Sequence, residues 1–388
     1  MSCIRRRGFR SRVLWLLATS VLLVPLIHLF HNILSHRARL DSHLPTLAPR
    51  QHIAFVKVHK AASSTIQNIF LRYGYTRNLT FVLGRTTNIY PNIISLTESV
   101  TDYNIEPIPP NKTFDILCSH VIYNRDAFRA IMPDDTVYLG SVRDPFQHFI
   151  SSLHYFRPSY IFNITATDPV AAYLKNPSKY EPKNVKHSMT NNRMALEFGF
   201  PLEVFRSRKK KTAAITEYLD QLDSEMDLIL VVEKLEESMV LLRRILNWKL
   251  QDILYIHKNS FAGMRNETRS KLSKKLYINE DTEEKYRKWA KLDYTLYDFA
   301  TKRLERQIQN QNPDFYDEVR HFKFVRVKVD NFCVYESRAY RPNILVIPQS
   351  EWNEQFIVNS LMCSLMQFKE RYFVEEIRFQ QYGHSPED

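Results

Sequence analysis

The chain has 388 residues, of which 44% are hydrophobic and 25% are charged, a composition typical of globular proteins that argues against wholesale disorder. Only seven residues are glycine, and they never cluster, which excludes collagen, glycine-rich linkers and a Gly-x-Gly-x-x-Gly dinucleotide motif. The net charge is +12, but residues 1–40 alone contain seven arginines and no acidic residue, so the basicity does not indicate a nucleic-acid partner.

An uncharged apolar segment, residues 13–35, is long enough to cross about 30 Å of hydrocarbon as a helix. Five arginines precede it, so the positive-inside rule places the N-terminus in the cytosol. A cleaved signal peptide is the main alternative, although its apolar region usually spans only about 7–15 residues. We therefore expect a cytosolic tail at 1–12, a transmembrane signal anchor at 13–35, a stem at 36–51 and a lumenal domain at 52–388.

The predicted lumenal body contains glycosylation sequons and few cysteines. Four Asn-x-Thr sequons follow the anchor, at Asn78, Asn111, Asn163 and Asn266. Three cysteines in the body (Cys118, Cys333 and Cys363) allow at most one intramolecular disulfide, and their spacing fits no zinc site. The body must therefore depend on a hydrophobic core.

Strands alternate with helices along the body. Residues 52–58 predict a strand, and the apolar spacing of Ile66, Ile69, Phe70 and Tyr73 predicts an amphipathic helix after it. Further strands are expected at 114–118, 136–142 and 228–232, and further helices at 146–156, 235–246, 282–309 and 354–368. Residues 322–329 read as a strand. The basic segment 206–211 reads as a solvated loop, with a docking patch for an anionic acceptor as the alternative. This order predicts an α/β fold with a central parallel sheet flanked by helices.

The junction between the first strand and its helix has the features of an anion site. Free N–H groups and the helix dipole gather where the helix begins, and Lys60 stands just before it. Ser63, Ser64 and Thr65 offer hydroxyls and amides at the same place. The alternative is an ordinary helix cap made by Ser63 or Ser64, with Lys60 on the surface.

A second junction follows the strand at 136–142. Arg143 stands at the strand end, where a guanidinium can bind a phosphate with two hydrogen bonds. Pro145 suits the first helical turn. Ser151 follows about two turns along the helix and can offer a hydroxyl to the same group. The alternative is a surface ion pair between Arg143 and Asp144 or another acidic residue.

Together the two junctions resemble the sulfotransferase superfamily, and most closely the galactose 3-O-sulfotransferases. Those enzymes carry a Lys-Thr-His-Lys-Thr-[Ala/Gly]-Ser-Ser-Thr pattern, which here stands as Lys57-Val-His59-Lys60-Ala-Ala-Ser63-Ser64-Thr65. Further similar segments lie at 78–81, 118–120, 142–145, 151–156, 236–242, 252–255 and 292–299. The resemblance covers residues 52–310 and implies a P-loop-like sulfotransferase fold in a type II Golgi membrane protein.

The resemblance also implies a reaction and a donor. Sulfate would pass from PAPS (3′-phosphoadenosine 5′-phosphosulfate) to the 3-OH of galactose on a glycolipid or glycoprotein, and this chemistry requires no metal. The residues implied for the 5′-phosphosulfate are Lys60, Ala62, Ser63, Ser64 and Thr65. Arg143 and Ser151 are implied for the 3′-phosphate.

Sulfate transfer needs a charge stabiliser and a base. Lys60 suits the leaving oxygen, and the base should be a group with a pKa near the working pH. His120 is the first candidate because it follows a predicted strand end, where α/β sheets bind ligands. Related uronyl 2-O-sulfotransferases resemble the sequence there and have a histidine taken as the base. His59 is the second candidate; the alternative for either histidine is a purely structural role.

The sequence also allows further site residues and two other functions. Glu233 and Asn192 are candidates for acceptor contacts, and Tyr155 is a candidate for stacking on a sugar or adenine face. A uronyl 2-O-sulfotransferase shares the loop and the histidine motif. A catalytically inactive, glycan-binding member of the fold is a further alternative. The sequence does not specify the oligomeric state.

Overall fold

The computed structural model describes residues 48–86, 90–156, 164, 166, 168–206, 211–256, 280–336 and 344–383. The predicted tail and anchor, most of the stem, Asn163, Asn266 and residues 207–210 of the basic segment lie outside these ranges. Among the residues described, no helix is both long and apolar enough to cross a bilayer.

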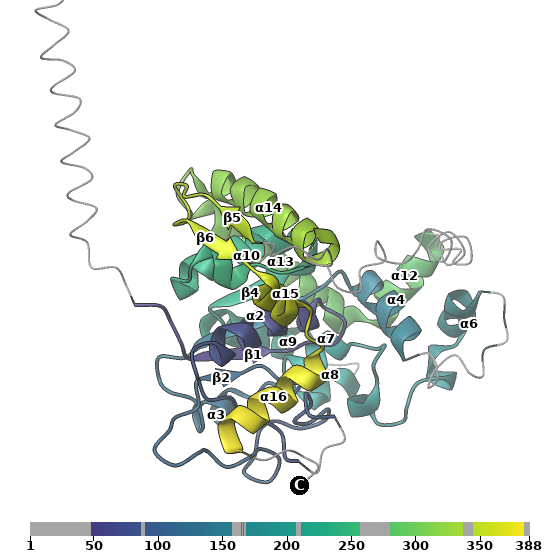
Figure 1. Ribbon diagram of the computed structural model, residues 1–388. Coiled ribbons are helices and arrows are strands. Elements are labelled where there is room, and N and C mark those ends of the chain that lie inside the picture. The colour runs from purple at the N-terminus through teal and green to yellow at the C-terminus, as the bar shows by residue number, and fades with distance from the viewer. Residues whose placement is uncertain are drawn as a thin grey trace, which may run out of the picture. The chain divides into compact units, whose positions relative to one another are not determined.

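A four-stranded parallel sheet lies at the centre of the body (Figure 1). Its order is β2–β1–β3–β4, with β1 at Ile53–Val56, β2 at Ile116–Leu117, β3 at Val137–Val142 and β4 at Leu228–Val231. All four strands fall within predicted segments. Every residue in them is buried, which explains why they appear in the sequence as continuous apolar runs.

Helices follow the strands and cover the sheet. The helices predicted after β1, β3 and β4 are α2 (Ser63–Tyr75), α4 (Pro145–Tyr155) and α10 (Leu235–Leu246). Helices that the sequence analysis did not predict are α3 (Arg125–Arg129), α6 (Pro169–Lys175), α7 (Arg193–Glu197), α8 (Leu202–Arg206), α9 (Lys211–Glu225) and α16 (Glu370–Tyr382). Away from the sheet, α4 and α6 share a second, smaller core with α12 (Glu280–Trp289), and these three helices lie together in Figure 1.

The predicted helix at 282–309 is interrupted. It consists of α12 and α13 (Lys291–Gln309), because the backbone at Ala290 leaves the helical region with φ −103° and ψ 47°. The side chain of Asn192 accepts hydrogen bonds from the amides of Leu292 (2.9 Å) and Asp293 (3.1 Å), which satisfies the first turn of α13. A cap from a distant segment leaves no local signal in the sequence.

The strand predicted at 322–329 is wrong, because this segment lies inside α14 (Phe315–Asn331). Phe322, Val325 and Val329 are buried at helical spacing, whereas Phe324 and Val327 are exposed. Apolar residues on both faces of the helix therefore imitate the alternation of a strand.

The helix predicted at 354–368 is correct only in its second part. β6 (Phe356–Val358) occupies its beginning and pairs with β5 (Leu345–Ile347) in an antiparallel hairpin. The helix α15 (Ser360–Gln367) starts after Asn359, whose side chain accepts a hydrogen bond from the Met362 amide at 2.9 Å. An asparagine cap of this kind fixes a helix start firmly.

The C-terminal segment returns to the first helix of the body. Both α15 and α16 contact α2, and Asn68 on α2 donates a hydrogen bond to the Leu365 carbonyl at 3.0 Å. Cys333 and Cys363 form the single disulfide that the cysteine count allows, and Cys118 is free and buried. The disulfide therefore ties α15 to the segment that follows α14.

Candidate active site

Three parallel strands deliver the predicted site residues to one edge of the sheet. β1 leads into the β1–α2 loop (residues 57–62), β3 leads into Arg143, and β2 leads through Cys118 and Ser119 to His120. Because β1 lies between β2 and β3, its loop stands between the other two strand ends. The carboxyl edge of a parallel sheet is the usual place for a ligand in this class of fold.

The β1–α2 loop has a strained backbone that exposes amides at the helix start. Lys60 and Ala62 both have left-handed backbone angles, with φ 60° and φ 54°. Such angles cost free energy in residues other than glycine and are concentrated at functional sites. Ala62 is the N-cap of α2 and provides no side-chain hydrogen bond, so the alternative of a serine cap is wrong. The helix start is thus available to an anion.

Arg143 and Lys60 lie next to each other. The guanidinium of Arg143 donates a hydrogen bond from Nη1 to the carbonyl oxygen of Lys60 at 3.1 Å. The Lys60 ammonium lies 3.9 Å from the centre of the Tyr155 ring, which is 67% exposed. The alternative of an ion pair between Arg143 and Asp144 is not found among the described residues, where the Asp144 carboxylate instead accepts the Gln147 amide at 2.9 Å. The guanidinium of Arg143 is therefore in direct contact with the backbone of Lys60.

The helix after Arg143 is attached to the same loop. His148 on α4 is fully buried and donates from Nε2 to the His59 carbonyl at 2.8 Å. Ser151 lies half-buried on α4, and no described residue makes a hydrogen bond with its hydroxyl. α4 thus holds the loop through His148.

His59 and His120 form a stacked pair, with ring centres 3.6 Å apart. Both carboxylate oxygens of Glu197 bind His59: one contacts Nδ1, and the other accepts the backbone amide at 2.8 Å. Nδ1 of His120 instead bonds to the Lys57 carbonyl at 2.8 Å. A carbonyl or a carboxylate beside Nδ1 assigns the proton there, so Nε2 of each ring is the proton acceptor.

Burial and neighbouring charges set the protonation of this cluster. Burial lowers the pKa of His59, although the Glu197 carboxylate opposes it, and burial lowers the pKa of His120 more strongly. Burial would raise the pKa of Glu197, but Arg193 and His59 lower it to about 2. At neutral pH, Glu197 is therefore ionised and both imidazoles are neutral.

The same three side chains are of types that bind metals. One ligand-type atom from each of His59, His120 and Glu197 lies within 4.8 Å of the others. Hydrogen bonds within the protein already explain this proximity, because His59 bonds to Glu197 and His120 bonds to the Lys57 carbonyl. The expectation of a reaction without a metal stays a prediction.

Comparison with known proteins identifies the family. The family model described as galactose-3-O-sulfotransferase matches residues 7–350. The chain belongs to the galactose-3-O-sulfotransferase family. It is 30% identical to human galactosylceramide sulfotransferase over 254 residues, which are 64% of this chain and 56% of that protein. It is 28% identical to human galactose-3-O-sulfotransferase 2 over 343 residues, 87% of this chain and 81% of the relative.

In this member of the galactose-3-O-sulfotransferase family, the two residues predicted to contact the acceptor, Glu233 and Asn192, make hydrogen bonds within the fold. Glu233 accepts the Asp144 amide at 3.0 Å and the Tyr297 hydroxyl at 3.2 Å, so it holds the start of α4. Asn192 is engaged by the first amides of α13. Glu197, in contrast, was not predicted as a site residue, although its carboxylate binds His59.

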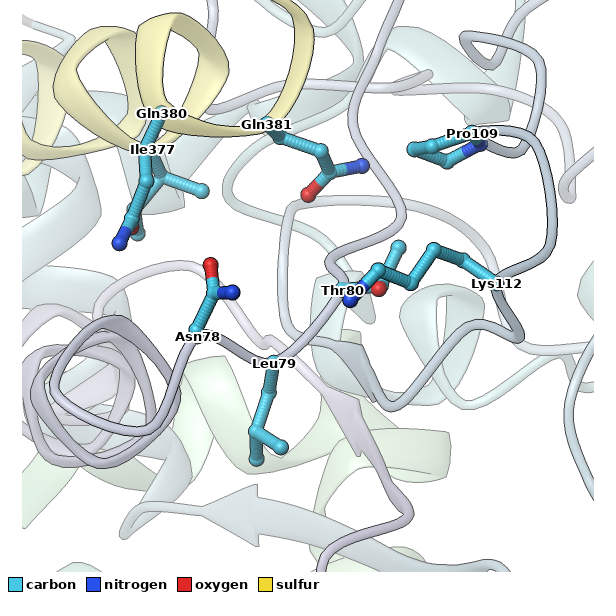
Figure 2. A pocket seen from close by; sticks show the side chains of 8 residues that line it. All are labelled: Asn78, Leu79, Thr80, Pro109, Lys112, Ile377, Gln380 and Gln381. Carbon is cyan, nitrogen blue, oxygen red and sulfur yellow. The ribbon is translucent and has the colours of Figure 1, made fainter.

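The pocket in Figure 2 shares no lining residue with the strand-end site. It has a volume of 150 Å³, below the roughly 300 Å³ at which small-molecule sites begin. Its lining residues are Asn78, Leu79, Thr80, Pro109, Lys112, Ile377, Gln380 and Gln381.

Two predicted sequons adjoin this pocket, and Asn78 and Asn111 are both exposed. Thr80 is buried whereas Thr113 is exposed, which makes the Asn111 sequon the more accessible one.

Proposed function

We propose that the protein is a PAPS-dependent carbohydrate sulfotransferase that sulfates the 3-OH of galactose on a glycolipid or glycoprotein. The observation that supports this most directly is the hydrogen bond from Arg143 to the Lys60 carbonyl, because it joins the two predicted phosphate-binding groups. Family membership supports the reaction class. The names of relatives such as galactosylceramide sulfotransferase support the acceptor.

In this proposal the loop and α4 hold the donor. The amides of Ser63 and Ser64 and the Lys60 ammonium bind the 5′-phosphosulfate, and Arg143 and Ser151 bind the 3′-phosphate. PAPS supplies a sulfuryl group on a phosphate leaving group. Lys60 neutralises the charge that grows on the oxygen of that phosphate as the sulfur–oxygen bond breaks.

His59 is the better placed base. As the acceptor oxygen forms its bond to sulfur, Nε2 of His59 takes the hydroxyl proton, and the Glu197 carboxylate stabilises the imidazolium that results. A protonated His120 has a backbone carbonyl as its Nδ1 partner and no carboxylate. The partners of the two rings therefore favour His59 over His120, the first candidate from the sequence, which is left to orient His59 by stacking.

The test is sulfate transfer by the full-length chain. Radiolabelled PAPS is supplied with β-galactosides, with heparan chains and with chondroitin chains as separate acceptors. We expect label on the galactosides, at the 3-position. Label on the uronic-acid polymers alone would make the protein a uronyl 2-O-sulfotransferase. A chain that binds neither PAPS nor adenosine 3′,5′-bisphosphate in calorimetry would instead be a glycan-binding protein without activity.

We further propose a Golgi location, with the segment 13–35 as the anchor and the body in the lumen. The charge asymmetry around this segment and the exposed sequons at Asn78 and Asn111 support this topology. In isolated membranes, a glycosidase that removes N-linked glycans should increase the gel mobility of the protein, and Asn111→Gln should remove part of that shift. An unchanged mobility together with protease access from the cytosolic side would contradict the topology.

A further inference from the structure

Glu370, the first residue of α16, reaches the β1–α2 loop from the other end of the chain. Its Oε1 accepts hydrogen bonds from the Lys57 ammonium and from the side-chain amide of Asn92. Its Oε2 accepts the Ser64 hydroxyl at 2.6 Å. Glu370 lies beyond residue 350, where the match to the family model ends, so no motif pointed to it.

The Glu370 carboxylate is the counter-ion of the buried Lys57 ammonium. Lys57 is completely buried, and an unpaired ammonium in that position would be strongly destabilising. Burial by itself would raise the pKa of Glu370, but Lys57 and the hydrogen bonds from Ser64 and Asn92 bring the pKa below its ordinary value. Glu370 is therefore ionised at neutral pH.

The residues that bind Glu370 are in turn connected to other residues of the site. The Lys57 carbonyl accepts Nδ1 of His120 at 2.8 Å, and the Asn92 carbonyl accepts the His120 amide at 3.1 Å. Ser64 is the second residue of α2, directly after the anion-binding turn. A single carboxylate thus connects the helix start with the strand end that holds His120.

α16 is fixed well enough to act as a support. Arg378 bonds to the Glu106 carboxylate at 2.9 Å and to the Gly84 carbonyl at 2.7 Å. Gln381 exchanges hydrogen bonds with the backbone of Phe81, at 2.9 and 3.0 Å. Upstream, the disulfide at Cys363 restrains α15. The position of Glu370 is therefore determined by the fold and not by its own side chain alone.

We propose that Glu370 is a positioning residue for the sulfate donor. It holds the first turn of α2 and the end of β1 in the geometry that binds the 5′-phosphate end of the nucleotide. The carboxylate does not itself bind the nucleotide, because its charge has the same sign and three donors already occupy it. A loop released from Glu370 must be ordered when the nucleotide binds, and this ordering lowers affinity. The inference rests on the proposed function.

The test is the affinity of the full-length chain for adenosine 3′,5′-bisphosphate, measured by calorimetry. Glu370→Gln should weaken binding about tenfold, the effect of losing roughly one well-placed hydrogen bond. The KM for PAPS should rise similarly, while the KM for the acceptor stays unchanged. A purely structural defect would instead lower the fraction of active enzyme and change neither KM. The matched control is Glu376→Gln, an exposed residue of the same helix that contacts the Tyr75 hydroxyl at 3.3 Å.

A double variant covers the case in which Glu370→Gln alone does not fold. Lys57→Met/Glu370→Ala removes both members of the buried pair, which proteins often tolerate. It should fold with a normal melting temperature and still bind the nucleotide about tenfold more weakly. Unchanged or tighter binding by a folded variant would overturn the inference while leaving the proposed function intact. Absence of binding by the wild-type chain would overturn the proposed function instead.

Discussion

Lys60→Ala should lower kcat for sulfate transfer about 10²–10³-fold, the usual loss when one group that stabilises transition-state charge is removed. The Lys60 ammonium is half-buried beside the loop, where it lies over the Tyr155 ring at 3.9 Å. The loop itself is held through the backbone of Lys60, whose carbonyl accepts Arg143. Removal of the side chain therefore deletes the charge and keeps the loop, so nucleotide binding should fall much less than kcat.

The measurement is kcat and the KM for PAPS at saturating galactoside, with the melting temperature of each variant. Lys249→Ala is the control, because Lys249 is exposed and pairs only with Glu354 at 2.7 Å among the described residues. Lys60→Arg retains the charge in a larger, planar group and should recover part of the rate. Full activity of a folded Lys60→Ala variant would remove Lys60 from the reaction.

The core of the fold was predictable because its strands are buried on both faces. Each strand is a short apolar run, and such a run next to a helical pattern indicates a parallel α/β unit. The same reasoning located Lys60 and Arg143, since Lys60 stands in the loop between β1 and α2 and Arg143 directly follows β3. The sheet order then places them beside each other, as the hydrogen bond between them shows.

Residues that reach the site from distant elements were not predictable in this way. Glu197 contacts His59 across 138 positions of the chain, and Glu370 contacts Lys57 across 313. Glu370 begins α16, where an acidic residue is common for local reasons, whereas Glu197 is the last residue of the short helix α7, where no local pattern marks it. Only the tertiary arrangement selects these two carboxylates from the 42 acidic residues of the chain.

Glu197→Gln should lower kcat about 10²–10⁴-fold, the range in which general base catalysis contributes. The Glu197 carboxylate raises the pKa of His59 against the opposing effect of burial. Without this charge, His59 is a weaker base, and the acidic limb of the kcat–pH profile should move to lower pH while the plateau falls. If Glu197 acts through His59, the His59→Ala/Glu197→Gln double variant should be no slower than His59→Ala.

The same carboxylate should make folding sensitive to acid. Its pKa is lowered from 4.5 to about 2 in the folded chain, so its contribution is present above about pH 4.5 and is lost as the pH falls toward 2. At about 1.4 kcal/mol per pKa unit, that contribution is about 3 kcal/mol. Glu197→Gln should be less stable than the wild type by this amount at pH 7, and the gap should close as the pH falls toward 2.

Thermal unfolding at pH 7 and pH 3 measures this gap, with Glu217→Gln as the control, because Glu217 is exposed on α9. A control variant that matches the wild type at both pH values assigns the acid sensitivity to the buried cluster. Arg193 keeps hydrogen bonds to the carbonyls of Lys186 and Leu96, both at 3.1 Å, so loss of Glu197 should weaken the cluster without unfolding the domain. Wild-type kcat in a folded Glu197→Gln variant would refute the assignment of His59 as the base, because an imidazole without its carboxylate cannot keep the same basicity.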